Sequence, residues 1–155
     1  MNSLTISASA VINARPEEVY SVIADYRKGH PAILPKENFA DLQVESGGYG
    51  TGTIIRFRSR VLGTERRFHQ IVSEPEPGRV LVEKDIQGPI TTTFTVTPVE
   101  NGQGSEESHS QVNITTEMAT SPGLQGWVER FVLPRALKPI YKKELQQLAA
   151  YVQSK

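Results

Sequence analysis

The sequence contains no cysteine among its 155 residues. Disulfide bonds, thiolate metal sites and thiol catalysis are therefore excluded. The chain also lacks an excess of either charge, because 17 Lys and Arg residues balance 17 Asp and Glu residues. A nucleic-acid-binding surface needs a clustered basic excess, so the composition argues against a nucleic-acid partner.

Long apolar runs are missing as well. The N-terminal segment MNSLTISASAVINA has neither a basic start nor an unbroken apolar stretch. We therefore expect no signal peptide, no stable membrane insertion and a cytoplasmic location. The three histidines, at positions 30, 69 and 109, are far apart and lack the spacing of a metal-binding motif. We expect no metal site and no cofactor.

The chain is instead rich in strand signals. Residues 4–13 alternate between apolar and polar side chains, which predicts a strand. Apolar residues then recur at helical spacing over 16–26, and the segment 26–35, broken by glycine and proline, predicts a second short helix or an irregular turn. Six further segments rich in Val, Ile, Thr and Phe predict an antiparallel meander, at 39–48, 51–63, 64–77, 79–86, 91–100 and 110–119.

Two connecting segments have simple interpretations. Residues 101–110 are polar and rich in Gly and Ser, so we expect a mobile hairpin loop that leaves His109 solvated. The glycine-rich run 47–52 is followed by a strand and by no Lys-Ser/Thr pair. A phosphate-binding loop needs a helix N-terminus at that place, so the run predicts a hairpin turn.

The last quarter of the chain predicts an amphipathic helix from Ser121 to about Val152. Roughly thirty residues at ~1.5 Å each give about 45 Å, so this helix must lie across the sheet. A sheet that curls around it encloses a cavity. The apolar stripe rotates by roughly a third of a turn near Pro134 and Pro139, which predicts a kink or break over 133–139. We expect the second half to anchor on the sheet and the first half, with the single Trp, to lie at the cavity mouth.

Three segments resemble the START-like superfamily, in its polyketide cyclase/dehydrase and lipid-transport branch. They are ASAVINARPEEVYSVIADY, VESGGYGTGTIIRFR and FHQIVSEPEPGRVLVEKD. The resemblance extends from Leu4 to about Val152. It implies a single domain over 1–155 with the α+β helix-grip fold, in which a curved seven-stranded antiparallel sheet wraps around a long C-terminal helix and two short helices follow the first strand.

The resemblance also implies a hydrophobic cavity, since members of this superfamily bind lipids, sterols, polyketides or plant hormones. We therefore expect binding, or transport, of a small hydrophobic ligand such as a lipid, isoprenoid or polyketide. The alternative is a cyclase or dehydratase that uses acid–base groups of the cavity, with Tyr26, His69 and Glu83 as catalytic candidates. A third hypothesis, based on the first half of the long helix, is a partner-binding or membrane-surface module. The sequence predicts no oligomeric state.

Aromatic side chains supply the predicted ligand contacts. As plain core residues they need no further explanation, whereas as a pocket wall they give a ligand a large apolar contact area. Threonines over 91–97 fit either a half-solvated sheet edge or a hydroxyl-lined side of the cavity. Together with a histidine at the cavity entrance, the predicted ligand contacts are Tyr26, His30, Phe57, Phe68, Phe94, Trp127 and Phe131.

Charged residues on two strands allow two interpretations. Arg56, Arg58 and Arg60 share one strand face, as Glu83 and Asp85 share another, and cross-strand pairing would make these rows a solvated outer face. In the alternative, one pair such as Arg67 with Glu83 points inward, where the carboxylate could orient a ligand carbonyl or act as a general base. The strand register decides between them.

Overall fold

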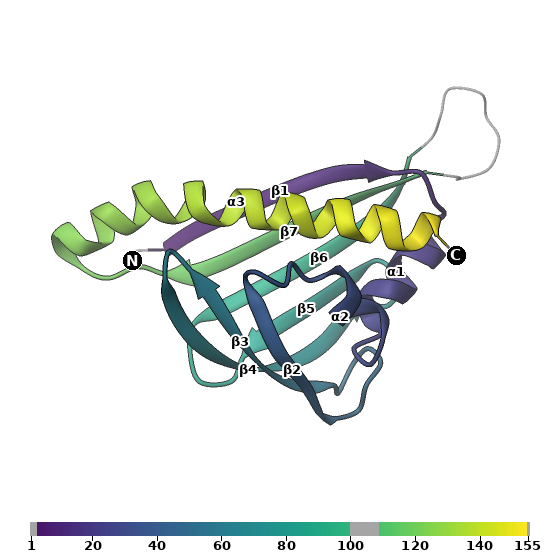
Figure 1. Ribbon diagram of the computed structural model, residues 1–155, viewed down its shortest axis with the longest axis horizontal. Helices are drawn as coiled ribbons and strands as arrows, with labels where there is room; N and C mark the ends of the chain where they lie inside the picture. Colours follow the sequence, from purple (N-terminus) through teal and green to yellow (C-terminus); the bar gives the residue numbers. More distant parts are fainter. Residues whose placement is uncertain (1–2, 100–108, 155) are drawn as a thin grey trace.

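The computed structural model describes residues 3–99 and 109–154, which form seven strands and three helices (Figure 1). In chain order the elements are β1 (Ser3–Ile12), α1 (Pro16–Ala24), α2 (Gly29–Ile33), β2 (Phe39–Ser46), β3 (Ile54–Val61), β4 (Thr64–Glu76), β5 (Val80–Asp85), β6 (Ile90–Val99), β7 (His109–Ala119) and α3 (Gly123–Gln153). Most of the loop predicted over 101–110 lies outside the described residues. His109 was expected in that loop but begins β7, opposite Val99.

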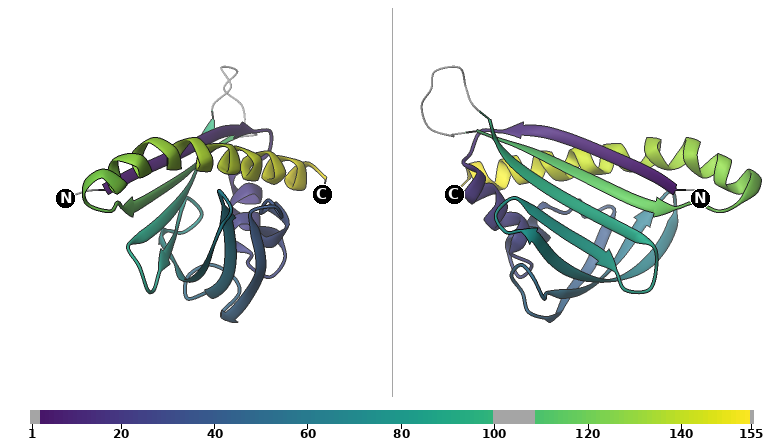
Figure 2. Two further views of the ribbon diagram at one scale, coloured as in Figure 1. Left: turned by 60° about the vertical axis from the view of Figure 1, so that its left-hand side comes forward. Right: turned by 180° about the vertical axis from the view of Figure 1, so that it is seen from behind.

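The seven strands form one antiparallel sheet in the order β1-β7-β6-β5-β4-β3-β2. Strands β2 to β7 are neighbours in both sequence and space, which confirms the predicted meander, and β1 pairs with β7 at the opposite edge. Two further views show the sheet curling on one side of α3, with α1 and α2 at the end near the C-terminus (Figure 2). The predicted helix-grip architecture is confirmed.

Glycines bring the two short helices into place. Gly29 lies so close to α1 that an added Cβ would stand 2.6 Å from the carbonyl oxygen of Val22. The predicted turn at 47–52 joins β2 to β3, and four of its glycines have positive φ. Its Gly48 carbonyl accepts a hydrogen bond of 2.9 Å from the N–H of Tyr26. These contacts hold the α1–α2 junction against the sheet.

Helix α3 runs without interruption from Gly123 to Gln153, so of the predicted kink or break, the break is wrong. Figure 1 shows one continuous coil with a gently arched axis. Pro134 and Pro139 each remove one backbone hydrogen bond, but the bonds of the neighbouring turns keep the helix together. At the same place Arg135 donates a side-chain hydrogen bond of 2.9 Å to the carbonyl of Phe131.

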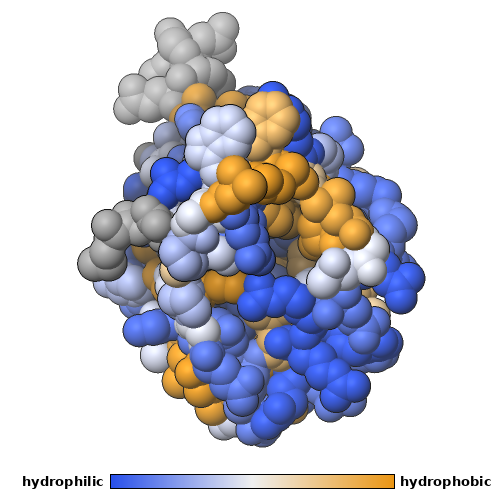
Figure 3. Space-filling view, turned by 90° about the vertical axis from the view of Figure 1, so that its left-hand side faces the viewer, coloured by the Kyte–Doolittle hydropathy of each residue, from blue (hydrophilic) through white to orange (hydrophobic). Residues whose placement is uncertain are grey.

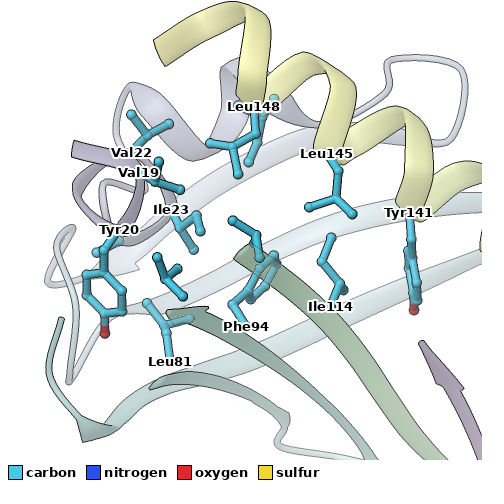
Figure 4. Close-up of a cluster of buried hydrophobic side chains, with 14 of the residues drawn as sticks. Val19, Tyr20, Val22, Ile23, Leu81, Phe94, Ile114, Tyr141, Leu145 and Leu148 are labelled. Atoms are coloured by element: carbon cyan, nitrogen blue, oxygen red, sulfur yellow. The ribbon is translucent and has the colours of Figure 1, made fainter. Parts of the chain in front are cut away.

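The densest part of the core lies beneath the second half of α3, as predicted. Figure 4 shows this helix and α1 packing their apolar side chains onto the inward faces of the central strands. Each fully buried aliphatic side chain contributes roughly 1.5–3 kcal/mol, so this end anchors the helix. The cluster includes Val19, Val22, Ile23, Leu81, Phe94, Ile114, Leu145 and Leu148. Over the described ranges, none of the helices is long and apolar enough to cross a membrane.

Candidate functional site

The other end of the interior is hollow. A cavity of about 330 Å³ lies between the sheet and α3, and α2 contributes to its wall. Its volume is at the lower end of the range for small-molecule sites. Alternate residues of β3 to β7 line it, as expected for the concave face of a sheet. Most of the lining is apolar, including Ile55, Phe57, Phe68, Ile114, Met118, Leu133 and Leu137.

Four of the predicted ligand contacts line this cavity: His30, Phe57, Phe68 and Phe94. Phe57 and Phe68 are register partners on β3 and β4, and their rings stack with centroids 5.2 Å apart. Tyr26 is fully buried behind His30, and the two rings stack at 4.3 Å. Phe94 meets the His30 ring edge-on at 5.5 Å. The structure therefore brings five of the seven predicted residues together.

Trp127 and Phe131 do not line the cavity. Their side chains are 73% and 60% exposed on the outer side of α3. The apolar stripe predicted on this half of the helix points away from the sheet, and Leu133 and Leu137 face the cavity instead. The two aromatics lie beside the mouth, without forming its wall.

Glu83 of β5 is the centre of a buried acid–base cluster. The hydroxyl of Tyr26 donates a hydrogen bond to Glu83 Oε2, and His30 Nε2 lies 3.4 Å from the same oxygen. His30 Nδ1 lies 2.7 Å from the carbonyl oxygen of Ile23. A carbonyl only accepts, so Nδ1 carries a proton and Nε2 faces Glu83. Burial, together with the charge and hydrogen bond of Glu83, raises the pKa of Tyr26 well above its ordinary value.

The inward position of Glu83 corrects the favoured interpretation of the acidic strand. Glu83 and Asp85 are both buried, whereas a solvated outer face was expected. The register sets Glu83 between Val72 and Thr92 on the concave face. Partners from the α1–α2 region make burial of the carboxylate possible, because a buried charge is costly without hydrogen bonds.

The basic strand does form the outer face that was predicted. Arg56 and Arg58 of β3 pair with Glu45 and Asp41, respectively. Arg67 lies opposite Arg58 in the β3–β4 register, so the suggested inward pair of Arg67 with Glu83 does not form.

His69 also lies on the outer face. Its neighbours Phe68 and Gln70 line the cavity, and His69 Nε2 instead lies 3.2 Å from Glu45 Oε2. Of the three catalytic candidates, the structure thus groups Tyr26 and Glu83 and separates His69 from them. Within residues 3–99 and 109–154, no cluster of three or more His, Asp or Glu side chains could hold a metal ion.

A row of polar side chains extends from Glu83 across the floor of the cavity. Glu83, Thr92 and Thr116 are register partners on β5, β6 and β7. The two threonine hydroxyls lie 2.8 Å apart, and Thr116 is also hydrogen-bonded to the hydroxyl of Tyr141 from α3. Burial and the charges of nearby glutamates raise the pKa of Tyr141 to about 12, despite the Thr116 hydrogen bond. The threonines over 91–97 were expected at a half-solvated sheet edge or on a hydroxyl-lined side of the cavity. Thr92 agrees with the second interpretation.

Glu144 adds a second carboxyl group from the helix side. It lines the cavity, is 3% exposed, and burial followed by the charge of Glu83 raises its pKa well above the ordinary value. Its Oε2 atom and Oε1 of Gln70, which also lines the cavity, have no hydrogen-bond partner among the described residues. Sequence reasoning missed Glu144. The available signal was a carboxylate inside the apolar stripe formed with Tyr141 and Leu145.

Solved structures share this architecture. The KanY protein is 26% identical, with a TM-score of 0.83 and 99% of both chains covered. The Zhui aromatase/cyclase from a Streptomyces species is 14% identical, with a TM-score of 0.74, and the match covers 98% of this chain and 94% of that chain. A START superfamily protein from Mycobacterium smegmatis is 12% identical, with a TM-score of 0.70 and 97% of both chains covered. The last two likenesses show the fold alone.

No curated protein matches the sequence. A family model does, over residues 3–153, and its description is polyketide cyclase/dehydrase and lipid transport. This match spans nearly the whole chain, and the START superfamily structure has the same fold. The chain therefore belongs to the polyketide cyclase/dehydrase and lipid-transport family.

Proposed function

We propose that the protein binds a small, mostly apolar molecule, such as a lipid, isoprenoid or polyketide, in the cavity beneath α3. The observation that carries the proposal is a 330 Å³ hollow beneath α3, lined mainly by aliphatic and aromatic side chains. Burial of apolar ligand surface there contributes roughly 25 cal/mol per Å². The stacked pair Phe57 and Phe68 provides a flat wall suited to a ring or an unsaturated chain.

The ligand has a polar end that can donate hydrogen bonds. Gln70 Oε1 is a buried acceptor and Glu144 Oε2 is a buried carboxyl oxygen, and neither atom has a partner among the described residues. Leaving such groups unsatisfied costs roughly 1–3 kcal/mol each, and a ligand hydroxyl would remove that cost. Thr92 and Thr116, which also line the cavity, can accept or donate beside them. An alcohol or phenol therefore fits the cavity better than a plain hydrocarbon.

Native mass spectrometry of the purified chain, followed by solvent extraction, tests the binding proposal. We expect a co-purifying apolar compound, or saturable uptake by the empty protein of 1-anilinonaphthalene-8-sulfonate, a fluorescent probe that joins apolar rings to a sulfonate group. Farnesol should displace the probe more strongly than farnesane, its hydrocarbon counterpart. Absence of both a bound compound and probe uptake would rule out a ligand-binding cavity.

A second candidate function is catalysis of dehydration or cyclisation, favoured by the cluster of Tyr26, His30 and Glu83 facing Glu144. In a dehydration, a basic group of the cluster removes a proton next to a substrate carbonyl. The neutral acid Glu144 donates its proton to the departing hydroxyl, which leaves as water. The raised pKa of Glu144 keeps that proton available above its ordinary titration range.

Variants that keep the cavity shape distinguish ligand binding from catalysis. Glu83→Gln and Glu144→Gln should leave probe uptake nearly unchanged, because both substitutions preserve volume. If the protein is an enzyme, both variants should lose turnover of a β-hydroxy ketone by about 100-fold or more. Wild-type protein that binds the ketone without converting it would exclude the catalytic candidate and leave the binding proposal standing.

A further inference from the structure

The first half of α3 carries an unusual exposed apolar stripe. Leu124, Trp127, Val128 and Phe131 follow the i, i+3, i+4, i+7 spacing of a single helix face. Their exposed fractions are 80%, 73%, 50% and 60%. On an ordinary amphipathic helix such a stripe faces the core. Here the core-facing side of α3 is occupied by other residues, and this stripe lies open.

The stripe lies on the outer side of α3, beside the cavity mouth. The β3–β4 turn presents a further exposed apolar residue, Leu62, which is 65% exposed and lines the cavity. Glu129 and Leu133, on the same helical turns as the stripe, line the cavity as well. Figure 3 shows hydrophobic side chains gathered around a recess on this face of the molecule. We call the five exposed apolar residues Leu62, Leu124, Trp127, Val128 and Phe131 the mouth rim.

The two segments that carry the mouth rim have more basic than acidic residues. Residues 58–67 and 123–138 together carry seven Lys and Arg residues against two Glu, although the whole chain has no net charge. Basic residues still outnumber acidic ones when Asp41, the ion-pair partner of Arg58, is included. Arg135 and Lys138 continue the exposed side of α3, and the Arg135 guanidinium lies 3.9 Å from the centre of the Phe131 ring.

We propose that the mouth rim docks on the surface of an anionic lipid bilayer, so that the cavity opens onto the membrane. The combination of Trp, Phe and Leu with Arg and Lys on one helix face suits the interface between headgroups and acyl chains. Anionic headgroups complement the basic residues around the rim. The apolar path from the rim into the cavity then lets a hydrophobic ligand pass without crossing water.

A second copy of this chain fits the rim less well. A symmetric dimer would bring the same positively charged surface against itself, and like charges across an interface oppose association. An acidic protein partner would match the charge. A bilayer also explains why the apolar patch lies beside the mouth of an apolar cavity, because a ligand dissolved in the bilayer can enter there without crossing water.

The single tryptophan makes the proposal directly testable, because Trp127 lies in the rim and is the only Trp of the chain. The full chain is mixed with phosphatidylcholine vesicles that contain or lack phosphatidylglycerol. With the anionic vesicles, we expect Trp127 emission to shift to shorter wavelength, quenching by lipids with brominated acyl chains, and co-flotation of the protein. High salt should reverse binding, since it screens the headgroup attraction.

Three variants with intact Trp127 define the surface. Leu124→Ser/Val128→Ser and Arg135→Gln/Lys138→Gln should each weaken binding to anionic vesicles by about tenfold or more. The matched control is Val11→Ser on β1, which is 61% exposed and outside the rim. It should bind like the wild type, and circular dichroism should show all variants folded.

Several results would overturn the proposal. They are an unshifted Trp127 emission with anionic vesicles, equal binding to vesicles of phosphatidylcholine alone, or equal losses in the control and rim variants. Concentration-dependent dimerisation that shifts the emission without lipid would assign the rim to a second copy instead. None of these readouts depends on a ligand in the cavity, so the outcome is independent of the proposed binding function.

Discussion

The hydroxyl of Tyr26 donates a hydrogen bond to Glu83 although the two residues are 57 positions apart in the chain. Both side chains are buried, and the stacked ring of His30 covers the pair. The contact joins the α1–α2 junction to the centre of the sheet at the polar end of the cavity. It is therefore both a structural link and the most chemically capable part of the site.

We expect the effects of substituting Tyr26 and Glu83 on stability to be coupled. Tyr26→Phe and Glu83→Gln should each lower the free energy of unfolding by about 1–3 kcal/mol, because each weakens or removes a buried hydrogen bond. The double variant should lose less than the sum of the two. Urea unfolding measures all three. The control is Tyr20→Phe, which removes a hydroxyl that donates to the more exposed Glu74 at 2.7 Å. It should lower the free energy of unfolding by less. Additive losses would contradict a direct contact.

The buried Glu144 predicts a specific dependence of stability on pH. Its folded-state pKa is raised by burial and by Glu83, so the unfolded chain releases this proton at lower pH than the folded protein does. The contribution of Glu144 to stability therefore falls as pH rises above 4.5, by up to about 1.4 kcal/mol per pH unit, until the folded-state group ionises.

Urea unfolding between pH 5 and pH 8 should show this loss in the wild type and a flatter profile in Glu144→Gln. The exposed residue Glu117 provides a control, and Glu117→Gln should follow the wild-type profile. Parallel profiles for all three proteins would show that Glu144 does not retain its proton in the folded state.

Filling the cavity should block ligand uptake. Leu137 lines the cavity from α3, and Leu137→Trp adds volume where a bound molecule would lie. We expect at least a tenfold loss of probe uptake, with a stability change of about 1–3 kcal/mol from overpacking. Gln125→Trp places the same side chain on an exposed position of the same helix and should bind normally. Equal uptake by both variants would place the probe outside the cavity.

Gly29 should be sensitive to a single methyl group. A Cβ at this position would lie 2.6 Å from the Val22 carbonyl oxygen, so Gly29→Ala must push α2 away from α1. We expect a loss of about 1–3 kcal/mol in thermal or urea unfolding. The exposed neighbour Lys28→Ala should change stability by less than about 0.5 kcal/mol. An unchanged Gly29→Ala protein would mean that the two helices are not held this closely.

Replacing an internal helix proline should stabilise the protein. Pro139 is exposed, lies within α3 and lacks the N–H that would bond to the carbonyl of Arg135. Pro139→Ala restores that donor, and we expect a gain of about 1–2 kcal/mol after the greater freedom of the unfolded chain is counted. A lower melting temperature would show that the arch of α3 depends on this proline.

The sequence was sufficient to predict most of the architecture. Alternation over 4–13, glycine turns between strands, and helical spacing after Ser121 are local signals, and each produced the expected element. Of the kink or break expected in α3, the break was wrong, because a proline removes only its own hydrogen bond while packing of Leu145 and Leu148 keeps the following turns in place.

Local patterns predicted the strands, their antiparallel meander and the long helix, whereas the family resemblance implied how the sheet packs around that helix. The tertiary structure decided which side of each element faces the hollow. Strand side chains alternate with period two, so a shift of one residue would exchange the buried Glu83 with the exposed Lys84, and only pairing with distant strands sets the register. In the same way, Trp127 lies at the surface because the contacts of α3 orient the whole rod, and no local spacing contains that information.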